Sequence, residues 1–199
     1  MVLHVAAVDI GSPQSGHLGW AIHGPQHQDG GDDIDSAIEL FANVLETGPL
    51  ALGFESPQFV PYRDEVRKLT RARHNERDRA FSAAPGATVL TTGLVVIPYI
   101  LKRLKQLRPD GLAWQNWNSL PEQRDELLVF EAFVTGKAKG NSHVADAERA
   151  IAAFQKGGAA PQNAIEETDC FSLLGAMLLR TGWTLDASEL SQPCLVVKA

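Results

Sequence analysis

Two short apolar runs, each ending in a carboxylate and a turn, constrain the fold of this chain more than any other feature. The first run, Val2 to Ile10, carries Asp9 near its end and is followed by a Gly-Ser-Pro turn. The second run, Leu50 to Glu55, ends in an acid directly before Ser-Pro. Runs of this kind are typical of buried strands, and buried strands joined through a helix usually pair in parallel. We therefore expect Asp9 and Glu55 to lie side by side at the carboxyl end of a sheet, where their repulsion favours a bound cation.

The stretch between the two runs predicts a hairpin partner and a crossover helix. A second strand is expected over His17 to His23, after turn residues that suit a tight hairpin. The polar, Gly-rich segment 24–31 shows no alternating pattern and is interpreted as a loop. Asp32 or Asp33 then caps a helix whose apolar residues recur at helical spacing up to Gly48-Pro49.

The remainder of the chain predicts a mixture of helices and strands. The expected elements are a polar helix over Tyr62 to Phe81, a buried helix over Leu90 to Leu107, a strand over Leu127 to Val134, a helix over His143 to Lys156, a helix from near Ala164, and an edge strand over Cys194 to Val197. With no repeat or composition break, residues 1–199 are expected to form one α/β domain, with a helical insertion at about 60–110. The sheet would hold about five strands and carry helices on both faces.

Charge and composition limit the classes of partner and compartment. The net charge of -6 gives no overall field that would attract nucleic acid, so any such binding must be local. The apolar run Leu94 to Leu101 contains Pro98 and falls far short of the roughly 20 residues of a membrane helix. The start of the chain is not basic, which argues against a signal peptide, and two cysteines form no disulfide framework. We expect a cytoplasmic protein without a membrane partner, and the sequence carries no signal for its oligomeric state.

Further acids near the end of the chain extend the expected cation site. Glu166 and Asp169 are three residues apart near the start of the helix expected from Ala164, so they would share one helical face. Together with Asp9 and Glu55 they would form a cluster of oxygen ligands suited to Mg²⁺ or Mn²⁺. Two such ions about 4 Å apart can hydrolyse a phosphodiester. These four carboxylates are therefore the candidate catalytic and metal-binding residues.

The order of these motifs resembles the ribonuclease-H-like superfamily, especially its RuvC-like branch. The likeness rests on the first-strand acid in AAVDIGSPQSGHLGWAI, the acid in LGFESP and the acidic pair in EETDCFSLLGAML. A closer likeness is to a family of predicted ribonuclease-H-like nucleases of prokaryotes, through FSAAPGA and VFEAFV as well. The resemblance implies an RNase-H-like sheet with a third hairpin strand, a metal-dependent nuclease of structured DNA or RNA, and Glu131 as a further ligand. The chain departs from the family pattern at Glu55, which replaces Asp, and beside Glu131, where Phe130 and Ala132 replace His and Pro.

Basic residues and a histidine offer further candidates. Residues 62–81 carry seven Arg or Lys against four acids, which suggests a phosphate-facing patch. Its candidate substrate-binding residues are Arg63, Arg67, Arg71 and Arg73. The ordinary interpretation of this segment is a solvated helix with internal ion pairs. His143 and Asp146 similarly read as a solvated helix face with a local ion pair, although a catalytic histidine is also compatible with the spacing.

Each acid also has a simple structural interpretation, and two other functions remain open. Asp9 suits a turn, Glu55 an exposed strand end, and Glu166 and Asp169 the positive end of a helix dipole. A non-catalytic RNase-H-like module that binds nucleic acid or protein is the first alternative. The second is a phosphotransferase of the actin and hexokinase type, which the DIGS sequence resembles, although 199 residues are short for that two-domain architecture.

Overall fold

A mixed seven-stranded sheet forms the centre of the molecule. The computed structural model describes residues 1–25, 28–76, 80–158 and 160–199. The strand order is β3-β2-β1-β4-β7-β6, and β9 also pairs with β7. The strands of this sheet are β1 (His4–Asp9), β2 (Gly19–His23), β3 (Gln28–Gly31), β4 (Leu50–Glu55), β6 (Leu112–Trp114), β7 (Glu126–Phe133) and β9 (Val196–Lys198). A separate two-stranded sheet consists of β5 (Phe59–Pro61) and β8 (Cys170–Ser172).

The register of the central strands confirms the expected parallel pair. β1 and β4 run parallel, and Asp9 is the register partner of Glu55. β1 and β2 form the expected antiparallel hairpin, and β3 extends it. The interpretation of residues 24–31 as a loop was wrong for β3, because a strand that pairs only with β2 at the sheet edge does not need alternating apolar residues. A third hairpin strand is what the family resemblance implied.

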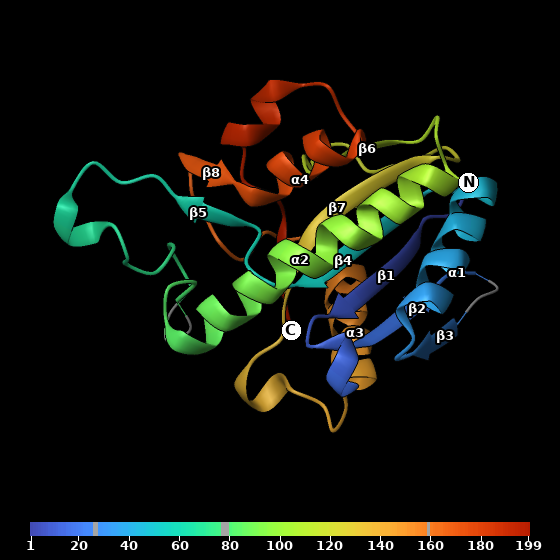
Figure 1. Cartoon of the computed structure of the whole chain (residues 1–199), viewed down its shortest axis with the longest axis horizontal. Helices are drawn as coiled ribbons and strands as arrows, with labels where there is room; N and C mark the ends of the chain where they lie inside the picture. The colour runs from blue at the N-terminus through green and yellow to red at the C-terminus, as the bar shows by residue number, and fades with distance from the viewer. Residues whose placement is uncertain (26–27, 77–79, 159) are drawn as a thin grey trace.

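In the described part of the chain, four α-helices cover the two faces of the sheet. They are α1 (Ile34–Thr47), α2 (Ala84–Leu107), α3 (His143–Lys156) and α4 (Leu173–Thr181). Figure 1 shows α2 in front of the sheet and α3 behind it. Because side chains alternate along a strand, Ala6 and Val8 of β1 belong to the core under α1, α2 and α4, while Val5 and Ala7 belong to the core under α3.

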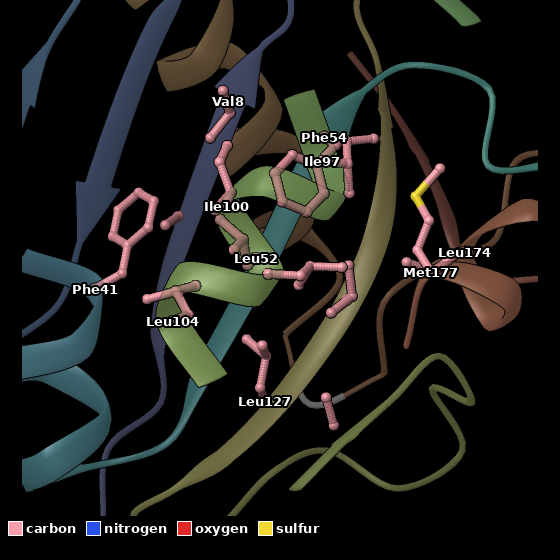
Figure 2. Close-up of a cluster of buried hydrophobic side chains, with 14 of the residues drawn as sticks. Val8, Phe41, Leu52, Phe54, Ile97, Ile100, Leu104, Leu127, Leu174 and Met177 are labelled. Atoms are coloured by element: carbon pink, nitrogen blue, oxygen red, sulfur yellow. The ribbon is translucent and has the colours of Figure 1, made fainter. Parts of the chain in front are cut away.

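The larger core fixes the carboxyl ends of β1 and β4. Figure 2 shows Ile97, Ile100 and Leu104 of α2 close to Leu52 and Phe54 of β4. All five side chains are buried. This packing supports the strand ends that carry Asp9 and Glu55.

The helix α2 combines length with an apolar composition. By these two properties alone it is long and apolar enough to cross a membrane. Six of its residues are buried in the structure: Gly93, Val96, Ile97, Ile100, Leu101 and Leu104. The absence of a membrane partner stays a prediction.

The structure corrects several predicted element boundaries. Residues 62–81 form no long helix within the described part of the chain, only a 3-10 turn at Val66–Lys68. The physical reason is that this segment has no apolar face: Val66 and Leu69 are exposed. The part of this segment around Val66–Lys68 extends away from the sheet in Figure 1, and Arg73 returns to contact Glu131 of β7. The following helix begins at Ala84, earlier than expected, because proline is well tolerated in a first turn, where Pro85 lies.

The last long helix, α4, begins later in the sequence than expected. Residues 164–169 are not helical, and Cys170–Ser172 pairs with β5 as a strand. Ser172 then caps α4, its Oγ accepting a hydrogen bond from the amide of Gly175 at 2.9 Å. The helix therefore starts after the paired residues 170–172, and Glu166 and Asp169 precede it in an irregular segment.

Candidate metal site

Three carboxylates from three separate elements meet at the carboxyl end of β1 and β4. Asp9 and Glu55 come from these strands, and Asp146 comes from the first turn of α3. One oxygen of each residue lies within 4.8 Å of an oxygen of each of the others. Asp9 and Asp146 are buried, and Glu55 is partly exposed. Among the described residues this is the one group of three or more His, Cys, Asp or Glu side chains placed to share an ion.

The first turn of α3 reaches the cluster because of Gly19 and Ser142. Gly19 is the register partner of Asp9 on β2, and a Cβ atom at this position would overlap the backbone of His143 and Val144. The helix can therefore pack directly on β2 only because residue 19 has no side chain. Ser142 fixes the start of the helix, since its Oγ accepts a hydrogen bond from the Ala145 amide at 3.1 Å.

A histidine and a lysine complete the cluster. His143 Nδ1 lies 2.5 Å from Asp9 Oδ2 and makes a hydrogen bond with it. Lys139 Nζ lies 3.4 Å from Glu55 Oε1 and 3.3 Å from Asp146 Oδ2. Asp146 also accepts a hydrogen bond from the Gly140 amide. Each carboxylate therefore has a charged or polar neighbour that orients it.

The proximity of the carboxylates has an electrostatic cost that falls on Glu55. Burial raises the pKa of Glu55 to about 9, with the Asp9 carboxylate the next cause, while the Lys139 ammonium opposes the shift. Burial alone would lower the pKa of Lys139, but the carboxylates of Glu55, Asp9 and Asp146 raise it above its usual value. The cluster holds more negative charge than one lysine balances, and a divalent cation would relieve the difference.

The residues present fit a hard divalent cation. The donor set is rich in carboxylate oxygen, which Mg²⁺ and Mn²⁺ prefer. Glu55 Oε2 is buried and has no hydrogen-bond partner among the described residues. A buried polar atom without a partner is costly, so an ion at this position would satisfy it.

Glu166 and Asp169 lie outside the cluster, and the expectation that they converge with Asp9 and Glu55 was wrong. Glu166 Oε2 lies 3.6 Å from His74 Nδ1, and its side chain is 71% exposed. Asp169 is exposed, and its backbone carbonyl accepts a hydrogen bond from Tyr62. The spacing argument failed because it required a helix over residues that are irregular or paired with β5.

Glu131 is also separate from the cluster and serves a buried ion pair. Its carboxylate accepts two hydrogen bonds from Arg73, at 2.6 and 2.7 Å, and both side chains are fully buried. The backbone amide of Gln58 donates a hydrogen bond to Glu131 at 2.9 Å. Glu76 is a second ion-pair partner of Arg73. Burial opposes the charge of Arg73, but Glu131 and then Glu76 hold the pKa of the guanidinium above its usual value. Both oxygens of Glu131 therefore already accept hydrogen bonds from Arg73 or Gln58, and Glu131 is not one of the clustered carboxylates.

The predicted substrate-binding arginines have different environments. Arg73 is buried as described, which contradicts a role in contact with substrate. Arg63 forms a bidentate pair with Glu167, with distances of 2.9 and 2.6 Å. Arg67 and Arg71 are exposed, and Arg71 lines a cavity of about 620 Å³ together with Arg63 and Lys68. A phosphate contact by Arg63, Arg67 or Arg71 stays a prediction.

Sequence reasoning assigned Asp146 to a solvated helix face, whereas the structure buries it. A signal was nevertheless present. Asp146 stands four residues before Ala150 and eight before Phe154, on the side of α3 that faces the sheet. An acid in register with an apolar stripe is a candidate functional residue, because a buried carboxylate requires a partner.

Comparison with known proteins adds no assignment to this geometry. The chain matches no protein-family model, no curated protein and no solved structure. The chemistry of the site has to be inferred from its own residues.

Proposed function

We propose that this chain is a metal-dependent hydrolase of phosphodiester bonds in structured DNA or RNA, with an RNase-H-like sheet. The observation that carries the proposal is the approach of Asp9, Glu55 and Asp146 to within 4.8 Å at the end of two parallel strands. Mutually repelling carboxylates at one point of a sheet are costly to a fold and useful to a metal enzyme. The antiparallel β1-β2-β3 hairpins followed by parallel β4 are the strand arrangement that the family resemblance implies.

The residues have distinct roles in this proposal. Asp9, Glu55 and Asp146 would hold Mg²⁺ or Mn²⁺ through oxygen atoms. Such ions, when bound, supply an activated water and stabilise the leaving oxygen of a phosphodiester. His143 orients Asp9 through the contact at 2.5 Å. The partly exposed Lys139 would pair with a phosphate oxygen of the substrate.

Lys139 also favours a second candidate function. Its ammonium lies between Glu55 and Asp146 and already neutralises part of their charge. A cluster balanced by an internal lysine is what a non-catalytic module on the same scaffold would retain. This alternative predicts nucleic-acid or protein binding that does not depend on Mn²⁺.

The test combines cleavage with direct metal binding. The wild-type protein should cleave labelled branched DNA or an RNA–DNA hybrid in Mn²⁺, and Asp9→Asn and Asp146→Asn should each lower the rate by at least 100-fold, because each removes a ligand charge. Glu166→Gln is the matched control, since Glu166 lies outside the cluster. Calorimetry should detect Mn²⁺ binding that is lost in Asp9→Asn and kept in Glu166→Gln.

Three results would count against the proposal. Cleavage that needs no metal would rule out a metal-dependent mechanism. Loss of activity in Glu166→Gln, with activity retained in Asp146→Asn, would show that the active site is not the cluster of Asp9, Glu55 and Asp146. Absence of both Mn²⁺ binding and cleavage would favour the non-catalytic module.

A further inference from the structure

A basic cavity lies beside the acidic cluster, between the second half of α3 and the end of the chain. Its volume is about 650 Å³. Arg149, Lys156 and Lys198 line it, and none of its described lining residues is Asp or Glu. In a protein with a net charge of -6, a cavity with three cations and no acidic side chain is a local reversal of sign.

The cavity and the acidic cluster are neighbours along two parts of the chain. Ala138 lines the cavity and directly precedes Lys139, which contacts Glu55 and Asp146. On α3, Arg149 follows Asp146 by three residues, which places it on the same side of the helix one turn away. Lys156 is two turns further, about 10.5 Å along the helix axis at 1.5 Å per residue.

A second, smaller cavity lies at Glu55. It is lined by Glu55, Lys139 and Phe133, among others. Phe133 in turn lies under Lys198, whose Nζ is 5.3 Å from the ring centroid. Lys198, which lines the basic cavity, therefore also lies next to a residue of the cavity at Glu55.

Local effects account for single residues but not for the group. Lys156 lies in the last turn of α3, where a cation is favoured by the helix dipole, and Lys198 gains a contact with Phe133. Arg149 donates a hydrogen bond to the carbonyl of Ala138. These contacts do not explain why three cations from two elements line one cavity without an acidic side chain to balance them. None of the three has an ion-pair partner at a described acidic side chain.

We propose that this cavity binds successive phosphates of the nucleic-acid strand whose backbone enters the acidic cluster. The inference rests on the proposed function and deepens it, since it names the surface that holds the substrate. The predicted patch at Arg63 and Arg71 is a weaker candidate, because Asp64, Glu65 and Glu167 line the same cavity and Arg63 is already paired. Phosphates bound by Lys and Arg displace counterions, so strand binding should weaken with salt.

The test separates binding from cleavage. The affinity of the protein for a fluorescein-labelled 20-nucleotide DNA strand is measured by anisotropy in EDTA over a range of salt concentrations. The double variant Lys156→Gln/Lys198→Gln should bind at least tenfold more weakly at low salt. The slope of log K against log[salt] should shrink by about 0.7 for each lost phosphate contact. The matched control is Lys102→Gln/Arg103→Gln, which removes two exposed charges from α2 on the other face of the sheet.

The outcomes distinguish the two proposals and the two sources of phosphate. Equal affinity and slope in the wild type and the Lys156/Lys198 variant would overturn the cavity proposal, as would an equal loss in the Lys102/Arg103 control. The wild type could instead bind inorganic phosphate saturably, with this binding lost in the Lys156/Lys198 variant while strand binding is unchanged. That result would overturn the proposal that the cavity binds a nucleic-acid strand and would identify its ligand as a small anion. If the strand binds through the cavity but no Mn²⁺-dependent cleavage occurs, the cavity proposal stands and the proposed hydrolase activity fails. Unfolding midpoints of all variants show that each is folded.

Discussion

Glu55 carries the electrostatic strain of the acidic cluster. Its pKa rises from 4.5 to about 9, mainly through burial and then through the Asp9 carboxylate. The folded protein therefore keeps a proton on Glu55 over a pH range in which the unfolded chain has released it. Since the folded pKa is the higher one, the stabilisation is fully present below pH 4.5 and is lost as the pH rises toward 9.

We predict that Glu55→Gln flattens this dependence. In EDTA, the free energy of unfolding of the wild type should fall between pH 6 and pH 9, and the variant should lose most of that fall because an amide does not ionise. The measurement is the urea midpoint at several pH values. Glu148→Gln, on the exposed side of α3, is the control and should follow the wild type. A parallel decline in Glu55→Gln would show that another group is responsible.

Individual residues of the site differ in how well the sequence alone predicted their roles. Asp9 and Glu55 were predicted together because each acid ends a run whose strand character is local. The place of Asp146 in the cluster depends on a non-local event, the packing of α3 on Gly19, which no spacing within the helix reveals. The family resemblance implied Glu131 as a ligand, but its contacts are set by Arg73, 58 residues earlier in the chain.

At the scale of elements, α3 brings the third carboxylate to the two strand ends. Its position depends on contact between its first turn and β2 at Gly19. The strands β1 and β4 and the helices α1 and α3 were predicted with correct or nearly correct bounds, because apolar spacing and caps at Asp33 and Ser142 are local signals. The start of α4 was not, because β8 pairs with β5, a strand more than 100 residues away.

We predict that Gly19→Ala displaces α3 and disrupts the cluster. The added Cβ overlaps backbone rather than a flexible side chain, so the free energy of unfolding should fall by about 1–3 kcal/mol, as for overpacking. Mn²⁺ affinity should fall as well, because His143 and Asp146 move with the helix.

Gly48→Ala is the matched control for this prediction. Its backbone is extended with φ of -168°, and an added Cβ would make ordinary contacts of 3.6 Å or more. The control should change stability and Mn²⁺ affinity little. If Gly19→Ala also leaves stability and Mn²⁺ affinity unchanged, the position of α3 does not depend on its close contact with Gly19.

At the scale of the whole molecule, the acidic cluster and the basic cavity give one region two opposite charges in a protein that is negative overall. Ions that bind only the folded chain stabilise all of it by linkage. The carboxylates come from three elements that are remote in sequence, so a bound ion would join β1, β4 and α3.

We predict that Mn²⁺ raises the thermal unfolding midpoint of the wild type. At 100 times the dissociation constant the expected stabilisation is about 2.7 kcal/mol. Asp146→Asn should abolish the increase, and Glu166→Gln should retain it. An equal increase in all three proteins would indicate non-specific binding to surface acids.

The pairing of β9 has a consequence for the order of events on the ribosome. One edge of β7 is covered by β6 at its beginning and by β9 at its end, through the partners Glu131 and Val196. During translation the end of that edge, at residues 131–133, stays open until residues 196–198 have left the ribosome. Loss of residues 196–198 would leave the end of β7, at Glu131–Phe133, without a partner on this edge, and exposed strand edges recruit other chains.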